Sequence, residues 1–162
     1  MTQLLQGIAV TLTTATAPAD AGTGNELYIG IVGTGGGREF PLDSPSDDFN
    51  TGEVEKFALG VIWEGGFLTG STKFPNLSEP GQFNDPALIP LDIDLVNFVY
   101  LRKQGDIDQD NVDDAYRLKA LRVVLYGESP SKRTFQFDNG GHSLWLATEN
   151  GHVAYLKEED KD

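Results

Sequence analysis

Apolar side chains in this chain alternate with other residues over short segments and almost nowhere recur at the spacing of a helix. In the first such segment, Ile8, Val10 and Leu12 share one face, as on a half-buried strand. The segments cover residues 7–14, 27–32, 38–42, 54–59, 95–102, 116–126, 134–137, 143–147 and 152–157. Between the last two, Asn150-Gly151 is a strong hairpin signal. The pattern predicts an all-β fold, an antiparallel β-sandwich of two sheets with about eight strands and helix limited to short turns.

One of these segments, residues 95–102, is apolar on both faces. Phe98 and Tyr100 alternate there with Val99 and Leu101. A strand that is apolar on both sides is typical of the centre of a sheet whose two faces are covered. We therefore expect a central strand that is packed on both sides.

The chain length of 162 residues suits one domain with one core. We expect residues 1–157 to form that domain and residues 158–162 to be a charged tail. The series of strand-like segments is interrupted at about residues 60–90, and we call this stretch the insertion. Its prolines and glycines exclude a long regular element, yet it carries Trp63, Phe67 and Phe74. Two interpretations remain open: these aromatic residues pack on the sandwich, or they form a surface that binds a protein partner.

Acidic residues outnumber basic ones by 25 to 12, which gives a formal net charge of −13. This balance argues against binding to nucleic acid and against unaided docking on an anionic membrane. No cysteine is present, so disulfides and thiolate chemistry are excluded. The first residues lack the basic start and the apolar run of a secretory signal, and a cytoplasmic location is therefore expected.

Catalytic signals are sparse. The chain has two histidines, no cysteine and no G-x-S-x-G nucleophile elbow. The glycine run at residues 33–37 is followed by Arg38 and a strand-like segment, so a hairpin turn fits it better than a phosphate-binding loop. The sequence predicts a protein that is not an enzyme.

Acidic residues concentrate in loops that an antiparallel sandwich brings together. Successive strands alternate in direction, so the loops at residues 14–25, 43–53 and 103–115 are expected to share one end of the sandwich. The side chains gathered there would be Asp20, Asn25, Asp47, Asp48, Asn50, Asp106, Asp108 and Asp110. Calcium prefers six to eight oxygen ligands, and this cluster supplies oxygens. The sequence therefore predicts a possible Ca²⁺ site, although residues 106–117 do not complete an EF-hand loop, because Asn111 and Arg117 replace its glycine and glutamate.

The order of several segments also resembles a known family. These segments are AGTGN followed by ELYIGIVG, then DDFNTGEVEKFALG, then FVYLRKQGDIDQDNVDDAYRLKALRVV, and finally RTFQFDNGGHSLWLATENGHVAYL. In this order and spacing they resemble the PLAT domain, a β-sandwich of lipoxygenases, pancreatic-type lipases and a clostridial phospholipase toxin. The resemblance covers most of residues 20–156, with the insertion as its one large gap.

The resemblance implies a binding or targeting role rather than catalysis. PLAT domains bind calcium through an AGTD turn and the loop before the fourth strand, which adds Thr23 to the candidate ligands. Here Gly24 stands in place of the family aspartate, with Asn25 beside it. The implied function is a stand-alone module that uses calcium to bind a membrane or a lipid-handling protein. The alternatives are a metal-independent protein-interaction module and a sugar-binding sandwich.

Strand alternation places the insertion at the end opposite the acidic loops. Its aromatic residues would then lie far from a calcium ion that bridges to lipid. We therefore expect weak binding to anionic liposomes even with calcium, and a protein partner bound through the insertion.

Overall fold

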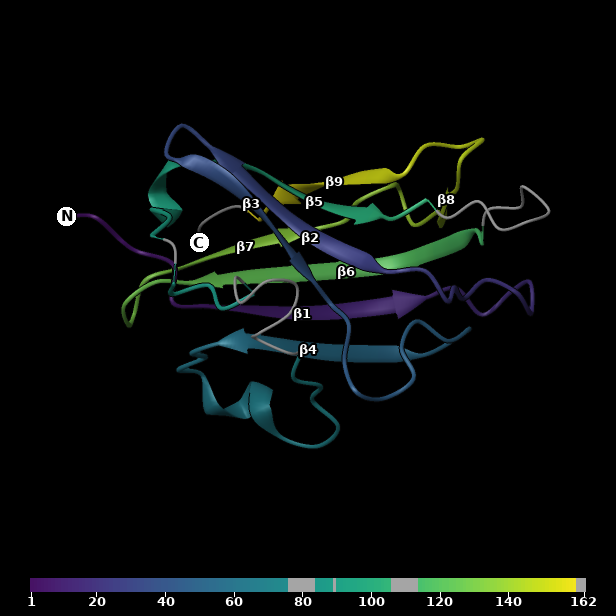
Figure 1. Cartoon of the computed structure of the whole chain (residues 1–162), viewed down its shortest axis with the longest axis horizontal. Helices are drawn as coiled ribbons and strands as arrows, with labels where there is room; N and C mark the ends of the chain where they lie inside the picture. The colour runs from purple at the N-terminus through teal and green to yellow at the C-terminus, as the bar shows by residue number, and fades with distance from the viewer. Residues whose placement is uncertain (76–83, 89, 106–113, 160–162) are drawn as a thin grey trace.

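The computed structural model describes residues 1–75, 84–88, 90–105 and 114–159, and two layers of antiparallel strands make up most of it (Figure 1). The strands are β1 (Gly7–Thr14), β2 (Leu27–Gly33), β3 (Gly36–Pro41), β4 (Val54–Gly60), β5 (Val96–Lys103), β6 (Tyr116–Tyr126), β7 (Lys132–Gln136), β8 (Leu144–Leu146) and β9 (Val153–Glu158). Helical structure in the described residues is limited to two 3₁₀ turns, η1 (Gly65–Leu68) and η2 (Ile93–Leu95). The predicted all-β sandwich is confirmed.

The strand order shows how the two layers connect. One layer has the order β7-β6-β1-β4, with β8 beside β6, and the other has the order β3-β2-β5-β9. The layers are joined by a short pairing of β7 with β9, in which Phe135 faces Glu158 and Gln136 faces Lys157. All nine strands therefore belong to one sheet that curls over itself. The alternating residues predicted to share faces, such as Ile8 and Val10 of β1, are fully buried between the layers.

The expectation that residues 95–102 are covered on both faces is wrong on one side. Strand β5 is central, between β2 and β9, and its Val99 and Leu101 are fully buried. On the other face, however, Phe98 is 56% exposed. Aromatic side chains favour strands whichever way they point, so their presence does not by itself indicate a covered face.

The acidic loops meet at one end, as strand alternation predicts. The end of β1 lies beside the start of β4, because Thr13 pairs with Val54. It also lies beside the start of β6, because Thr14 pairs with Leu118. The first two loops touch through the Thr23 N–H, which donates to the Phe49 carbonyl at 3.1 Å.

The insertion begins at the opposite end, where Trp63 and Phe67 pack against the outer face of the β4-β1-β6 layer. The Trp63 ring makes an edge contact with Tyr126 at a centroid distance of 5.2 Å, and its Nε1 donates to the Gly127 carbonyl at 3.2 Å. Both aromatic residues are half-buried. Self-packing therefore accounts for these two residues of the insertion.

The insertion then comes back to the middle of the free edge of β4, where Lys73 forms a parallel bridge with Phe57 that strand alternation did not predict. The Lys73 N–H donates to the Lys56 carbonyl at 2.7 Å, and the Ala58 N–H donates to the Lys73 carbonyl at 3.0 Å. This contact covers part of an otherwise open strand edge. It also brings Lys73 and Phe74 beside Ser44, Pro45 and Ser46 of the 43–53 loop, so the expectation that the whole insertion lies far from the acidic loops is wrong for these two residues. No helix in the described residues is long and apolar enough to cross a membrane.

Candidate functional site

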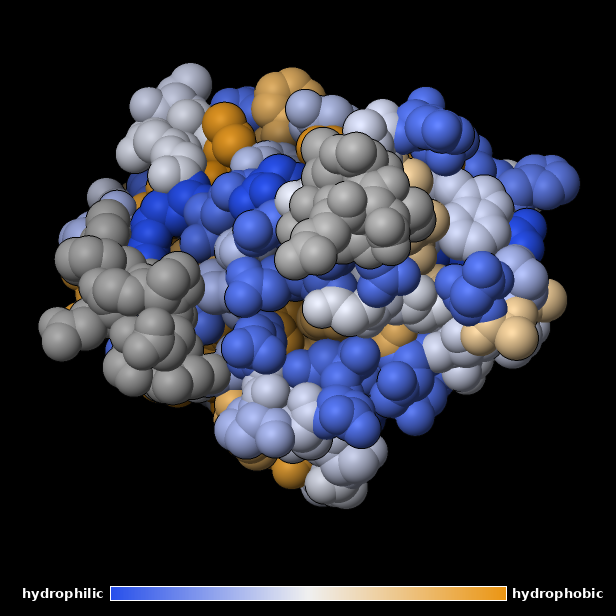
Figure 2. Space-filling view, turned by 45° about the vertical axis from the view of Figure 1, so that its right-hand side comes forward, coloured by the Kyte–Doolittle hydropathy of each residue, from blue (hydrophilic) through white to orange (hydrophobic). Residues whose placement is uncertain are grey.

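A cavity of about 510 Å³ opens at the acidic end of the sandwich, and we call it the acidic pocket. Six predicted metal ligands line it: Asp20, Thr23, Asn25, Asp47, Asp48 and Asn50. Three further acidic residues, Glu26, Asp43 and Asp114, also line it. Figure 2 brings this end of the molecule forward, and the coloured surface there is mostly hydrophilic. The predicted ligands Asp106, Asp108 and Asp110 lie outside the described residues.

The AGTGN turn is held against the loop before β4 by close backbone contacts. A β-carbon at Gly22 would lie 2.4 Å from the Phe49 carbonyl oxygen, so only glycine fits there. The Gly22 N–H donates to the Thr51 hydroxyl at 3.0 Å, and that hydroxyl donates to the Ala19 carbonyl at 2.9 Å. The sequence thus builds one wall of the acidic pocket from two loops that lie far apart along the chain.

A carboxylate approaches Gly24 from another loop. Asp114 Oδ2 accepts a hydrogen bond from the Gly24 N–H at 2.5 Å, and the Asp114 carbonyl accepts one from the Thr23 hydroxyl at 2.9 Å. Gly24 is the position where the resembling family has aspartate, and a β-carbon there would lie 3.5 Å from Asp114 Oδ2. Asp114 therefore supplies a carboxylate close to the position where the family motif has one, and it was not among the ligands predicted from the sequence.

Asn25 contributes an acceptor whose hydrogen-bonding capacity is unused. Its Oδ1 atom is buried and receives no hydrogen bond from the described residues, whereas its N–H donates to the Thr23 hydroxyl at 3.1 Å. Most buried polar side-chain atoms in proteins have a partner, so an orphaned oxygen indicates space for a bound water or cation.

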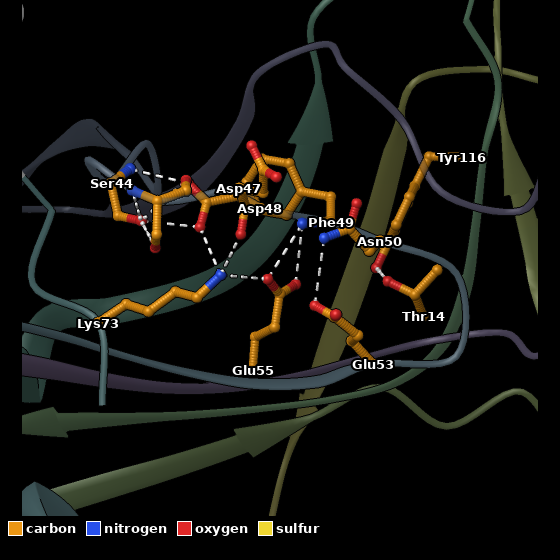
Figure 3. A network of polar contacts seen from close by, with 11 residues as sticks. Thr14, Ser44, Asp47, Asp48, Phe49, Asn50, Glu53, Glu55, Lys73 and Tyr116 are labelled. Atoms are coloured by element: carbon orange, nitrogen blue, oxygen red, sulfur yellow. Dashed lines mark hydrogen bonds and ion pairs between the residues drawn. The ribbon is translucent and has the colours of Figure 1, made fainter. Parts of the chain in front are cut away.

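A lysine of the insertion bonds to Asp48, one of the carboxylates that line the acidic pocket (Figure 3). Lys73 Nζ lies 2.7 Å from Asp48 Oδ1 and 2.6 Å from Glu55 Oε1, and it donates to the Asp47 carbonyl at 2.5 Å. Asp48 also accepts a hydrogen bond from the Ser44 N–H at 2.8 Å. Asp48, predicted as a metal ligand, therefore has a built-in cation as its partner.

Glu55 is the most deeply buried acid of this network, with a side chain only 2% exposed. Both of its carboxylate oxygens accept from the Phe49 N–H, at 3.1 and 3.0 Å. This contact holds Phe49 at a φ of 61°, a backbone conformation that residues with a β-carbon rarely adopt. Because side chains alternate along a strand, Glu55 lies on the same inner face of β4 as Phe57. This spacing is visible in the sequence, and it indicates a buried acid that requires a cation as its partner.

Burial and the bonds within this network shift the pKa values of Glu55 and Lys73. Burial raises the pKa of Glu55 more than Lys73 and the Phe49 N–H lower it. Burial alone would lower the pKa of Lys73, but the bonds to Asp48 and Glu55 outweigh it and the net shift is upward. Lys73 is thus held firmly in its charged form.

Two groups at this end contribute to an expected loss of stability at alkaline pH. The Tyr28 hydroxyl donates to Glu26, and burial followed by this bond raises the Tyr28 pKa from 10.0 to about 12. Since the folded chain holds this proton more tightly than the unfolded chain, the stabilisation is complete below pH 10.0 and disappears as the pH rises through about 12. The raised pKa of Lys73 acts in the same direction. Urea unfolding at successive alkaline pH values measures the loss, which should be smaller in Tyr28→Phe; an equal loss in that variant would contradict the assignment to Tyr28.

Acidic side chains alone do not form a complete metal site in the described residues. Within residues 1–75, 84–88, 90–105 and 114–159, no three His, Cys, Asp or Glu side chains are grouped closely enough to hold a metal ion. The acidic pocket nevertheless offers oxygens of the kind that Ca²⁺ binds, on Asp20, Asp47 and Asp114 and at the orphaned Asn25 Oδ1.

Of the three predicted partner-binding aromatics, Phe74 is the one presented to solvent. It is 59% exposed, and with Lys73 it lines a shallow hollow beside Ser44, Pro45 and Ser46. An exposed aromatic ring therefore lies next to the loop that carries Asp47 and Asp48. This placement follows from the bridge between Lys73 and Phe57 of β4.

Comparison with solved structures supports the fold. The chain aligns with the alpha toxin of Clostridium absonum at a TM-score of 0.56 and 19% identity, over 96% of this chain and 32% of the toxin. It aligns with the alpha-toxin of an avian strain of Clostridium perfringens at 0.57 and 17% identity, over 95% of this chain and 32% of the other. The corresponding values for coral 8R-lipoxygenase are 0.55 and 16%, over 95% of this chain and 17% of the lipoxygenase.

These similarities confirm a PLAT-like fold at the level of architecture. The structure of the coral enzyme is described as showing calcium activation via a C2-like domain. The present chain spans a third or less of each of these enzymes, so it corresponds to one part of them. No known family profile and no curated protein matches the sequence.

Proposed function

We propose that this chain is a non-catalytic binding module that docks on a phospholipid surface through its acidic end, with Ca²⁺ bridging the acidic pocket to lipid phosphates. One observation carries the proposal: an exposed aromatic ring, Phe74, lies beside a pocket lined by acidic residues and by the orphaned Asn25 oxygen. Calcium would supply the positive charge that this end lacks, and Phe74 would enter the headgroup region, where aromatic rings are favoured.

The net charge limits the strength of this docking. Two bound calcium ions add four positive charges to −13 and leave −9. Repulsion from anionic lipid persists at that charge, although salt screens it beyond about 8 Å under physiological conditions. Docking is therefore weak and depends on calcium.

Co-sedimentation with vesicles of phosphatidylserine and phosphatidylcholine tests the proposal. Calcium should increase the bound fraction of the unmodified chain, and Phe74→Ala should remove most of that increase. Leu68→Ala is the matched control, because Leu68 is an exposed apolar residue of the same insertion, in η1. Equal binding with calcium and with chelator, or equal losses in the two variants, would refute docking through the acidic end.

A thermal melt tests the calcium part by itself. Calcium that binds only the folded chain should raise the melting temperature, and Asp20→Asn and Asp114→Asn should each reduce that rise. Asp94→Asn, at an exposed position near the opposite end, is the control. Asp48 is unsuitable for this test because it holds Lys73. If neither calcium nor chelator moves the melting temperature, the acidic pocket is only a solvated surface.

A further inference from the structure

The outer face of β2, β5 and β9 carries an exposed aromatic cluster that the acidic-end proposal does not use. Tyr155 is 66% exposed and Phe98 is 56% exposed, and Val32 and Val153 beside them are also exposed. These residues alternate with the buried residues of the same strands, so they all point away from the core. An exposed cluster of rings on a sheet face is a candidate binding surface.

Tyr100 forms the floor of this cluster. It lies opposite Gly30 of β2 in the strand register, and its hydroxyl bonds to Glu39 Oε2 of β3 at 3.1 Å. To reach from β5 to β3, the ring must lie along the sheet surface over Gly30. A β-carbon at Gly30 would fall 1.9 Å from the ring Cζ atom, so the glycine provides the space in which the ring lies.

Tyr155 forms a wall beside this floor. It pairs with Tyr100 across β5 and β9, with ring centroids 5.8 Å apart and planes inclined at 57°. Phe98, two residues before Tyr100 on β5, also contacts the Tyr155 ring, at a centroid distance of 6.1 Å and an interplanar angle of 75°. Tyr100, Tyr155 and Phe98 together make an inclined floor and wall, which we call the aromatic corner.

The rim of the aromatic corner is polar and rigid. Arg102 Nε and Nη2 donate to the two carboxylate oxygens of Glu39 at 2.6 and 3.0 Å, and the guanidinium lies over the Tyr28 ring at 4.3 Å. A guanidinium has five N–H groups and a carboxylate accepts about four hydrogen bonds. The hydrogen bonds described here use two of those N–H groups and three of those acceptor sites, so donors and an acceptor remain for a ligand.

Charge and size define the ligand that fits. Glu39 and Arg102 neutralise each other, and exposed Lys157 on the same strand as Tyr155 disfavours a cationic ligand. The net charge of −13 disfavours an anionic one. The three rings expose roughly 300 Å², well below the roughly 800 Å² per partner of a stable protein interface. A small neutral ligand with an apolar face and a polar edge matches these features.

We propose that the aromatic corner binds a neutral carbohydrate, with the apolar face of one sugar ring on Tyr100 and Tyr155 and its hydroxyl groups at the Glu39–Arg102 rim. A pyranose ring presents C–H groups on one face and hydroxyls around its edge, which is the complement of an aromatic floor with a charged, hydrogen-bonding rim. This site shares no residue with the lipid-docking proposal, so either can fail without the other.

Affinity electrophoresis of the whole chain in gels containing laminarin, galactomannan or hydroxyethylcellulose tests the proposal. At least one of these neutral polysaccharides should retard the chain. Tyr155→Ala should weaken the apparent affinity roughly tenfold. Gly30→Ala should do the same while keeping every aromatic residue, because its methyl group displaces the Tyr100 ring. Tyr155→Phe and Phe74→Ala should bind like the unmodified chain, and thermal melts confirm that each variant is folded.

Two results would overturn the proposal. One is the absence of retardation by all three polysaccharides, and the other is retardation that Tyr155→Ala leaves unchanged. Binding to vesicles of phosphatidylcholine alone that is lost in Tyr155→Ala and absent for the polysaccharides would assign the aromatic corner to lipid instead.

Discussion

Replacing Lys73 by methionine should lower the free energy of unfolding by about 3 kcal/mol, because it leaves two buried carboxylates without their cation. Asp48 and Glu55 side chains are 6% and 2% exposed, and Lys73 Nζ is within 2.7 Å of both. Methionine retains all but the last atom of the unbranched side chain, so the loss of charge dominates the effect. In a chain of this size, the melting temperature should fall by about 6–12 °C.

Two further variants test the cause of this loss. The double variant Lys73→Met with Glu55→Gln should be more stable than the sum of the single effects predicts, because it removes one of the stranded charges. Lys56→Met is the matched control: Lys56 lies on β4 beside the same segment, and its ammonium lies over the Phe67 ring, 5.5 Å from the ring centroid. If Lys73→Met is no more destabilising than Lys56→Met in urea unfolding, Lys73 is not the counter-ion of this network.

The part of the fold that could be predicted from the sequence is the part with a periodic signal. Strand β1 has the predicted bounds, Gly7–Thr14, because its apolar residues alternate without interruption. The meeting of the acidic loops could also be predicted, because antiparallel strands must alternate in direction. The bridge between the insertion and β4 could not be predicted, because a single pairing of Lys73 with a strand edge leaves no pattern in the sequence.

The candidate site shows the same division. The types of residue that line the acidic pocket were predictable, whereas the partners of their side chains were not. Asp48 has the position expected of a ligand, but a lysine 25 residues away in sequence bonds to it. Similarly, the Tyr116 hydroxyl bonds to the Thr14 hydroxyl at 2.9 Å, although the two residues are 102 positions apart along the chain. The hydrogen-bond partner of a side chain depends on distances across the fold, and these distances cannot be read from composition or from the spacing of residues along the chain.

The second large loss of stability is expected when Arg133 is replaced by methionine. This residue lies at the short β7–β9 pairing that joins the two layers, which we call the seam. β7 and β9 share only a short pairing there, and Arg133 reinforces it. Its Nε and Nη2 donate to the two carboxylate oxygens of Glu158 at 2.8 and 2.7 Å. Its Nη1 donates to the carbonyls of Ile93 and Val96, which precede and begin β5. One side chain thus ties β7 to both β9 and the entry of β5.

Arg133→Met should therefore lower the free energy of unfolding by about 2 kcal/mol, since the lost hydrogen bonds involve a charged group that is only 12% exposed. Arg133→Lys should recover less than half of this, because an ammonium cannot reproduce the planar two-point contact with Glu158. Arg122 provides the control on the neighbouring strand: its contact with Glu159 is 3.2 Å long and its side chain is 54% exposed. Arg122→Met should change stability by no more than about 0.5 kcal/mol. Urea unfolding of the three variants decides the matter, and equal effects of Arg133→Met and Arg122→Met would mean that backbone pairing alone closes the seam.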